Sequence, residues 1–354
     1  MNAPIGVGII GLSTAGGWAA EAHVPALAAL DGYELRALAA SSAETAKRAG
    51  EHFGVAHGTV DELVKRDDVD LVAVTVKVPH HRELALAALA AGKAVLCEWP
   101  LGNGLAEAEE MAAAAEGARA FVGLQARSTP QVRYLRDLIA DGYVGEVLST
   151  SMIASGRRWG GTFEPRGEYL LDRANGATML SIPFGHTIDA LAMVLGEFAE
   201  LNSTIAVRRP EVHEVGTGRA VPMTAEDQIA VTGVLDGGAV ASVHYRGGLS
   251  RGTDFHWEIN GTEGDIIVSG GNGHLQFGQV NLRGARGAGE LAELAVPASY
   301  QLVPQVEPTK MAYTVAHAYA QIRDDIVNGT SEVPDFAHAV HRHRLLERIR
   351  QAAG

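Results

Sequence analysis

The sequence has a single cysteine, Cys97, among its 354 residues. One thiol cannot form an internal disulfide, which excludes the class of small disulfide-stabilised secreted domains and favours a reducing, cytoplasmic setting. Long apolar runs are also absent, because no stretch approaches the ~20 residues that cross a bilayer. The opening MNAPIGVGIIGL leads directly into apolar, strand-like sequence, so we expect no signal peptide and no membrane association.

Basic residues are few relative to acidic ones. The chain has 29 Lys+Arg against 42 Asp+Glu, a formal net charge of −13. Such a surface repels nucleic acid and anionic membranes, which leaves a small molecule or a protein as the expected partner. The sequence also lacks a Cys/His cluster, a G-x-S-x-G elbow and a Walker loop, so we expect no metal site.

The chain is long enough for two domains. Over residues 1–126, nearly continuous apolar runs alternate with helical patterns, as in a parallel sheet that is buried on both faces. We therefore predict an α/β Rossmann-type, doubly wound domain that binds a dinucleotide. The predicted strands are 5–12, 33–41, 69–77, 93–98 and 118–125.

Residues 127–354 have a different texture. After a predicted helix at 129–141, apolar and polar residues alternate, which indicates a largely antiparallel sheet with one exposed face. We predict an α+β substrate and oligomerisation domain with a large open sheet, and a homodimer or homotetramer formed through it. The predicted strands are EVLSTSMIAS, LNSTIAVRR, DQIAVTGVL, AVASVHYRG, DFHWEINGT, GDIIVSG and HLQFGQV, and the predicted helices are 176–195, 311–327 and 336–352.

A glycine-rich turn follows the first strand in VGIIGLSTAGGWAAEAH. Gly11 and Gly16 occupy the first and third positions of a phosphate-binding turn, and Ser13 stands at the second. Glycine at these places lets backbone N–H groups approach a pyrophosphate. The alternative is a plain βα turn, but the βαβ context favours dinucleotide binding, with Thr14 and Trp18 also in the loop.

The end of the second strand bears on the choice of cofactor. It reads Ala40-Ser41-Ser42, with Lys47 and Arg48 shortly after, and has no carboxylate that would repel a 2′-phosphate. Hydroxyls and cations there favour NADP over NAD, with Ser41, Ser42 and Lys47 as contacts. The alternative is that Ser42 only caps the next helix.

Several motifs together resemble the glucose–fructose oxidoreductase/inositol dehydrogenase (Gfo/Idh/MocA) family over the whole chain. Within it, the chain is most similar to the branch of the yeast galactose-pathway repressor. The motifs are GIIGLSTAGGW, ELALAALAAGKAVLCEWPLG, EAEEM, GYVGEV, GATMLSIPFGHTIDAL and INGTEGDI, with Leu-Gln-x-Arg-x-x-Pro from Leu124 to Pro130.

The resemblance implies a catalytic pattern from which this chain departs. Family enzymes have a Glu-Lys-Pro motif, and an aspartate four residues before an acid/base histidine. Here Glu98 and Pro100 match but Trp99 replaces the lysine, and Ile182 replaces the aspartate before His186. Neither replacement can transfer a proton, so the usual dehydrogenase mechanism is not expected. The positions implied at the cofactor are Val76, His81, Glu98, Trp99 and Gln125.

Polar candidates for chemistry remain. His186 suits proton transfer near neutrality, or is a buried helix histidine bonded to the backbone. Tyr169 and Asp172 could orient a ligand or replace the missing acid, or be structural. The candidate substrate contacts are Arg127, Trp99, Tyr245 and Lys77, while His341 and His343 fit a solvent-exposed helix face.

Three functions remain open. The first is an NADP(H)-dependent oxidoreductase acting on a small carbonyl, hydroxyl or imine substrate, since hydride transfer needs mainly cofactor and substrate held face to face. The second is a catalytically silent NADP-binding regulator or sensor, as the repressor resemblance implies. The third is non-redox chemistry with a recycled cofactor. We favour the first, with NAD as an alternative cofactor.

Overall fold

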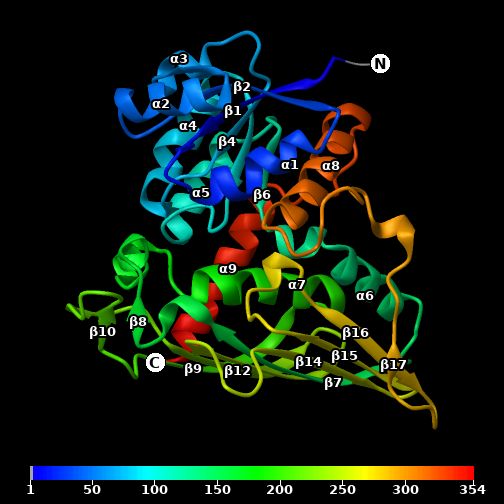
Figure 1. Ribbon diagram of the computed structural model, residues 1–354. Helices are drawn as coiled ribbons and strands as arrows, with labels where there is room; N and C mark the ends of the chain where they lie inside the picture. The colour runs from blue at the N-terminus through cyan, green and yellow to red at the C-terminus, as the bar shows by residue number, and fades with distance from the viewer. Residues whose placement is uncertain (1–2) are drawn as a thin grey trace. The chain divides into compact units, whose positions relative to one another are not determined.

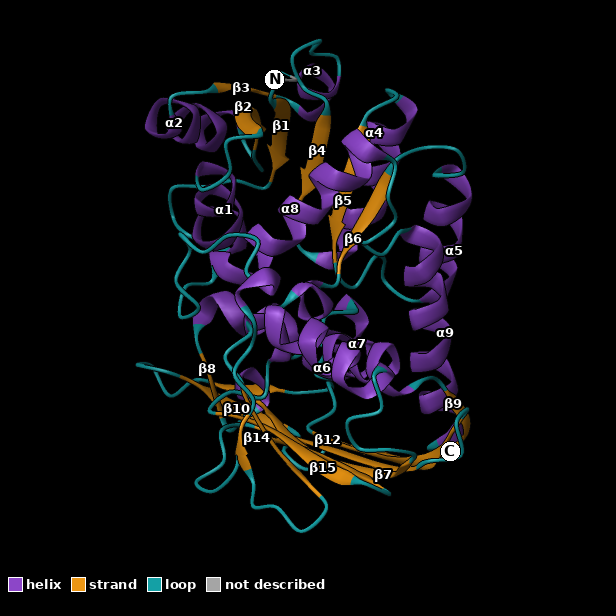
Figure 2. Cartoon of the chain, turned by 90° about the vertical axis from the view of Figure 1, so that its right-hand side faces the viewer, coloured by secondary structure: helices purple, strands orange, loops and turns teal. Residues whose placement is uncertain are grey.

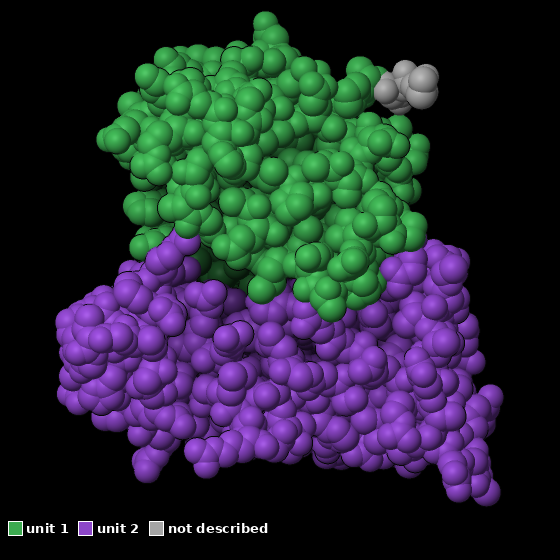
Figure 3. Space-filling model, viewed as in Figure 1, with its two compact units in different colours: residues 1–128, 302–343 green, residues 129–301, 344–354 purple. Residues whose placement is uncertain are grey.

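A computed structural model describes residues 3–354, which divide into two compact units (Figure 3). Unit 1 runs to Ser128 and also includes residues 302–343; unit 2 comprises residues 129–301 and 344–354. The predicted domain boundary at 126/127 lies close to Ser128, where the chain first passes from unit 1 to unit 2. The prediction placed residues 302–343 in the second domain, whereas they belong to unit 1. The structure differs because helix α8 (Ala312–Asn328) packs into the hydrophobic core of unit 1.

Unit 1 is built on a six-stranded sheet in the order β3-β2-β1-β4-β5-β6, and every pairing is parallel. The parallel sheet confirms the predicted Rossmann-type fold. All residues of β1, β4 and β6 are buried, as expected for strands covered on both faces. The strands are β1 (Ile5–Ile10), β2 (Tyr33–Ala39), β3 (Ala56–Gly58), β4 (Leu71–Val74), β5 (Ala94–Glu98) and β6 (Ala120–Gly123).

Helices lie on both faces of this sheet (Figure 1). Side chains from α1 and α8 share one core with Val7, Ile9 and Leu71, whereas Gly8 points to Leu63 of α3 on the other face. No helix within residues 3–354 is long and apolar enough to cross a membrane. The remaining helices of this part are α1 (Val24–Ala28), α2 (Ala43–Phe53), α3 (Val60–Val64), α4 (His81–Ala90) and α5 (Leu105–Ala114); α9 (Phe336–Ala352) ends in unit 2.

Unit 2 contains an eight-stranded sheet in the order β17-β16-β15-β14-β7-β13-β12-β9. Only the β7–β13 pairing is parallel, which confirms the predicted, mostly antiparallel sheet. Its strands are β7 (Val147–Gly156), β9 (Phe198–Ala206), β12 (Gln228–Leu235), β13 (Val240–Gly247), β14 (Phe255–Gly261), β15 (Gly264–Gly270), β16 (Asn281–Arg286) and β17 (Ala292–Glu293). A smaller sheet joins β8 (Thr162–Phe163), β10 (Glu211–Glu214) and β11 (Ala220–Pro222).

One face of the large sheet is covered by α6 (Pro130–Ala140) and α7 (Gly185–Leu195) (Figures 1 and 2). The burial of β13 alternates accordingly, with Val243 and Tyr245 buried and Val240 and His244 exposed. This alternation is what one covered face and one open face require.

Two predicted elements of unit 2 differ in the structure. The helix expected over 176–195 is present but begins later, with a π-helical turn at Leu180–Phe184, because Gly176 has φ of 69° and its carbonyl accepts from the Ser181 hydroxyl. HLQFGQV is not a strand: Leu275–Phe277 forms a 3₁₀ turn that ends at Gly278 in the left-handed conformation. The strands β16 and β17 follow it, and β17 is the edge of the sheet.

Candidate nucleotide-binding and catalytic sites

The glycine loop between β1 and the first helix has the backbone that a phosphate-binding turn needs. Gly11, Gly16 and Gly17 have φ of 105°, 85° and 111°. A Cβ on Gly11 would lie only 2.9 Å from Cγ1 of Val76, so the tight turn requires glycine there. Backbone N–H groups of this loop could therefore approach a diphosphate, and the residues present fit a dinucleotide.

Side chains of the loop partly satisfy its own backbone. Ser13 Oγ accepts from the Ala15 N–H at 3.2 Å, and Glu21 Oε1 accepts from the Gly17 N–H at 3.0 Å. The half-buried Trp18 meets the ring of His23 edge-on, with centroids 6.4 Å apart. Trp18 is the N-cap of a π-helical turn, Ala19–His23, which ends with this histidine and leads into α1.

The polar residues that follow β2 were predicted to contact NADP, and their side chains point in different directions. Ser42 is the N-cap of α2, since its Oγ accepts from the Thr45 N–H at 3.2 Å, and Ser41 is exposed beside it. Lys47 lies 4.0 Å from Glu51, one turn along α2. Arg48 instead donates to Oγ1 of Thr14 at 3.3 Å, so it is the cation that reaches the glycine loop.

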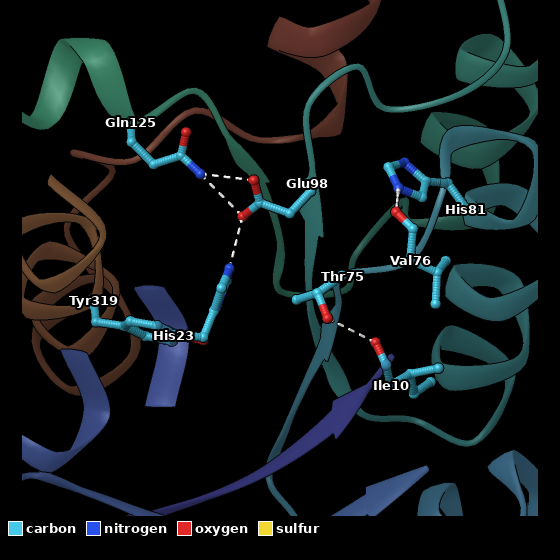
Figure 4. A network of polar contacts seen from close by, with 8 residues as sticks. All are labelled: Ile10, His23, Thr75, Val76, His81, Glu98, Gln125 and Tyr319. Atoms are coloured by element: carbon cyan, nitrogen blue, oxygen red, sulfur yellow. Dashed lines mark hydrogen bonds and ion pairs between the residues drawn. The ribbon is translucent and has the colours of Figure 1, made fainter. Parts of the chain in front are cut away.

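A polar network lies at the carboxyl ends of β5 and β6 (Figure 4). Glu98 accepts from Nε2 of Gln125 at 2.9 and 2.8 Å, and Oε1 of Glu98 lies 3.0 Å from Nε2 of His23. A Cβ on Gly123 would fall 2.7 Å from Glu98 Oε1, so glycine at that position gives the carboxylate its room. We call Gln125, Glu98, His23 and Tyr319 the Glu98 network.

The Glu98 network fixes the tautomer of His23. A carboxylate only accepts, so Nε2 of the ring donates to Glu98, and Nδ1 accepts from the hydroxyl of Tyr319 at 2.8 Å. Burial raises the pKa of Tyr319 well above its ordinary value, which keeps that hydroxyl protonated. Glu98 is thus held in place by Gln125, which follows β6, and by His23, which is itself bound to Tyr319 of α8.

His81 lies at the start of α4 and links two turns. Its Nδ1 lies 2.9 Å from the carbonyl of Pro100, and its Nε2 lies 3.0 Å from the carbonyl of Val76. Burial lowers the pKa of His81, although both carbonyls oppose the shift. At β4, Thr75 Oγ1 donates to the carbonyl of Ile10 at 2.8 Å, which ties this strand end to β1.

Trp99 is almost fully buried, at 4% exposure. The centroid of its ring lies 4.8 Å from that of His343 in α9. The prediction that the HRHR stretch faces solvent is wrong for Arg342 and His343, which are both buried; His341 is exposed. The histidine therefore packs on the tryptophan that replaces the family lysine.

In unit 2, His186 is buried in the first turn of α7, directly after the π-helical turn. Next to it, Thr187 lies 2.6 Å from the hydroxyl of Tyr245, and the same hydroxyl donates to the carbonyl of Gly273 at 2.9 Å. Tyr245 is fully buried, and burial raises its pKa above the ordinary value. Its hydroxyl is buried in unit 2 and links α7 to the segment that contains Gly273.

The other sequence-predicted residues are dispersed. Asp172 is exposed and caps a short turn through the Ala174 N–H at 3.0 Å, whereas Tyr169 is half-buried with its pKa raised by burial. In unit 1, Arg127 donates to Nε2 of His338 at 2.8 Å. Lys77 and His80 are exposed beyond the end of β4.

Sequence reasoning missed the partners of these residues. His23 and Tyr319 complete the Glu98 network, and His274 stacks between Trp159 and Phe277, with centroids 6.2 and 5.3 Å away. Burial, Arg158, His186 and Arg157 lower the pKa of His274 to about 3. His23 ends the glycine-rich stretch VGIIGLSTAGGWAAEAH, but nothing in its spacing indicates a contact with Glu98, and Tyr319 and His274 stand in no recognisable motif.

Each of the two units matches a known protein family or domain. Residues 5–125 match the family described as "Oxidoreductase family, NAD-binding Rossmann fold" (GFO_IDH_MocA), and residues 130–270 match "Gal80p, C-terminal domain". The chain is 31% identical over 292 residues to 1,5-anhydro-D-fructose reductase of Ensifer adhaerens, which covers 80% of this chain and 81% of that protein. The chain belongs to the GFO_IDH_MocA oxidoreductase family.

Regulators and dehydrogenases both occur among the relatives of this GFO_IDH_MocA member. It is 29% identical over 305 residues to the galactose/lactose metabolism regulatory protein GAL80 of Saccharomyces cerevisiae, over 79% of this chain and 70% of that one. It is 37% identical to dehydrogenase aclE of Aspergillus oryzae over 189 residues, which is 51% of this chain and 50% of that one.

Solved structures show the same fold. A super-repressor mutant of Gal80p from Saccharomyces cerevisiae has a TM-score of 0.89 at 25% identity, covering 99% of this chain and 96% of that one. Levoglucosan dehydrogenase in complex with NADH and L-sorbose has a TM-score of 0.84 at 22% identity, with 99% and 96% coverage, which shows the fold alone. Family membership therefore makes this an oxidoreductase-family protein with an NAD(P)-binding Rossmann fold, and leaves the choice of cofactor and substrate open.

Proposed function

We propose that this protein binds NADP(H) in unit 1 and transfers a hydride between it and a small carbonyl, hydroxyl or imine substrate. In the reducing direction, the hydride goes to the carbonyl or imine carbon and a proton goes to the oxygen or nitrogen. The bound nicotinamide supplies the hydride. No lysine takes part, because Trp99 stands at that position and is buried.

The contact between Arg48 and Thr14 carries the NADP preference. It places a guanidinium against the glycine loop, and the neighbouring strand end offers Ser41 and Ser42 instead of a carboxylate. A 2′-phosphate favours cations and hydroxyls, and Arg binds phosphate through a fork of donors. Lys47 is the weaker candidate of the pair, because it is directed along α2 to Glu51.

We assign proton transfer to His186, and the remaining predicted contacts to binding. Histidine titrates near neutrality and so can both give and accept a proton there. Gly11, Ser13, Thr14, Gly16 and Trp18 form the loop proposed to bind the diphosphate, while Glu98 and Gln125 shape the strand ends through the Glu98 network. Tyr169 and Arg127 remain the proposed substrate contacts.

Self-association through the open sheet face is part of the proposal. Ile153 of β7 and Val240 of β13 are 41% and 59% exposed on the same face of these neighbouring strands. Exposed apolar side chains gathered on one face are typical of subunit contacts. We propose a homodimer or homotetramer formed by this face.

The main alternative is a regulator that binds NADP without turnover. The observation that favours it is the loss of two polar catalytic positions, at Trp99 and Ile182, together with the match to Gal80p over residues 130–270. A regulator needs to bind its ligands but does not need a proton donor.

A turnover screen separates these functions. NADPH oxidation is followed with a panel of ketones, aldehydes and imines, for the wild type and for His186→Gln, and NADPH binding of both proteins is measured by nicotinamide fluorescence. The enzyme proposal predicts turnover in the wild type, and at least ~100-fold loss in a variant that still binds NADPH. NADPH binding without turnover on any compound of the panel would favour the regulator.

A further inference from the structure

Three separate segments of unit 2 meet beside His186. Gly273 lies directly on the backbone at the end of β7, since a Cβ there would fall 2.0 Å from the carbonyl oxygen of Ser155. Gly156 likewise lies against Met179, whose Sδ would be 2.6 Å from an added Cβ. The turn Arg157–Trp159 therefore starts at a point where the chain before His274 and the chain before His186 both pack.

Aromatic stacking and hydrogen bonds hold this meeting point. Trp159 stacks on His274 with an interplanar angle of 17°, and its Nε1 donates to the carbonyl of Leu170 at 3.1 Å, next to Tyr169. The Tyr245 hydroxyl joins Thr187 to Gly273, the neighbours of His186 and His274 in the chain. The two histidines are thus fixed on segments that one tyrosine connects.

Two adjacent cations stand at this point, although the whole chain carries −13 and the Asp254 carboxylate accepts from the nearby Ser155 hydroxyl at 2.6 Å. Arg157 and Arg158 are exposed, and within residues 3–354 neither guanidinium has a hydrogen bond or an ion pair. Arg219 of the same unit, in contrast, is paired with Glu168 and Glu214. Burial and then the charges of Arg158, His186 and Arg157 lower the pKa of His274, whereas burial raises the pKa of Tyr169 and Arg158 opposes that shift.

We propose that the substrate of this protein carries an anionic group, a carboxylate or a phosphate, and that Arg157 and Arg158 bind it beside His186. The inference rests on the proposed function, because it names the substrate class of the same site. Two exposed guanidinium groups next to each other attract an anion and hold it by charge and by hydrogen bonds. Their planar forks of N–H donors match the oxygens of a carboxylate or a phosphate.

The test compares pairs of ligands in which one carries an anionic group and the other does not, on the NADPH-saturated protein. By calorimetry we would measure the binding of oxamate against neutral oxamide, and of dihydroxyacetone phosphate against dihydroxyacetone. Saturation with NADPH keeps the phosphate out of the nucleotide site. The variants are Arg157→Gln and Arg158→Gln, with Arg208→Gln as the control, because Arg208 is an exposed arginine of unit 2 whose guanidinium has no bond within residues 3–354.

The proposal predicts that at least one anion binds while its neutral partner binds weakly or not at all. Affinity should fall roughly tenfold or more in Arg157→Gln or Arg158→Gln, and stay unchanged in Arg208→Gln. Whichever pair shows the effect identifies the carboxylate or the phosphate. Equal binding of charged and neutral partners, equal loss in Arg208→Gln, or no binding of either anion would overturn it. A failure of the proposed function would look different. The protein would then not bind NADPH at the start, or it would bind the anion but show no turnover.

Discussion

Nε2 of His23 lies 3.0 Å from Oε1 of Glu98, so a histidine of the first helical turn holds the glutamate at the end of β5. The other nitrogen of the same ring lies 2.8 Å from the Tyr319 hydroxyl in α8. Glu98 is the one polar member that this chain keeps of the Glu-Lys-Pro motif. Its carboxylate is engaged by buried partners, so we regard it as a group that shapes the strand ends rather than a free acid or base.

Tyr319→Phe should destabilise the protein, because it removes the hydroxyl that donates to Nδ1 of His23 and leaves a buried acceptor without that bond. We expect the free energy of unfolding to fall by about 1–3 kcal/mol in a urea titration. Tyr300→Phe is the matched control: its hydroxyl binds Asp137 at 2.6 Å but is partly exposed, so the loss should be smaller. Equal losses in the two variants would argue against the Glu98 network as a buried structural unit.

Arg48→Gln should weaken NADPH binding by about tenfold and leave NADH binding nearly unchanged, because a charged contact to the 2′-phosphate is lost. Lys47→Gln removes the same charge one residue away, at a side chain that lies by Glu51, and should change little. Fluorescence titration of both variants with both nucleotides measures the difference. A larger effect of Lys47→Gln would show that the lysine, as the sequence predicted, binds the phosphate.

Trp99→Lys recreates the family's Glu-Lys-Pro motif, but we expect it to unfold more easily rather than to gain activity. The indole is 4% exposed and packs on His343, so the substitution removes buried apolar contacts and buries an ammonium group. The expected loss of stability is about 3 kcal/mol or more, measured by urea unfolding. Trp99→Phe keeps an aromatic ring and should cost clearly less. A lysine variant as stable as Trp99→Phe would mean that the site is more open than the structure indicates.

His274→Phe should make stability less dependent on pH. Burial, followed by the charges of Arg158, His186 and Arg157, lowers the pKa of His274 from 6.5 to about 3 in the folded protein. Between these values the unfolded chain binds a proton that the folded chain does not, so stability falls as the pH drops below about 6.5.

The contribution of this one group is about 1.4 kcal/mol per pH unit within that window. The phenyl ring of His274→Phe can still stack on Trp159 and Phe277, and it has nothing to titrate. Urea unfolding at about pH 7 and about pH 5 should show a smaller decrease for His274→Phe than for the wild type. Parallel pH profiles would contradict the lowered pKa.

The parts of this protein that follow from periodicity could be predicted from the sequence. β1 and β4 are continuous apolar runs, and β13 alternates, so both sheets and their types were predicted correctly. α8 was predicted as a helix, but its amphipathic pattern does not specify which sheet it packs on, and it joins the core of unit 1. Arg342 and His343 are polar, so the sequence suggested an exposed helix face. Their burial depends on what α9 packs against, which the sequence pattern does not specify.

Side-chain direction limited the prediction of the site. Lys47 and Arg48 are equivalent cations in a sequence, yet on α2 consecutive residues point about 100° apart, and only Arg48 reaches Thr14. Tyr245 was expected at a substrate, but an inward position on β13 places its hydroxyl between Thr187 and Gly273. Ser42 is a helix cap in the structure, which the sequence had left as an alternative.

The most direct test of the proposal is a fluorescence titration of the purified protein with NADPH and, in parallel, with NADH. The account predicts that NADPH binds, and binds more tightly than NADH, because Arg48 and the serines after β2 favour the 2′-phosphate. Equal or tighter binding of NADH would contradict the assigned cofactor, and failure of both nucleotides to bind would contradict the proposed function as a whole.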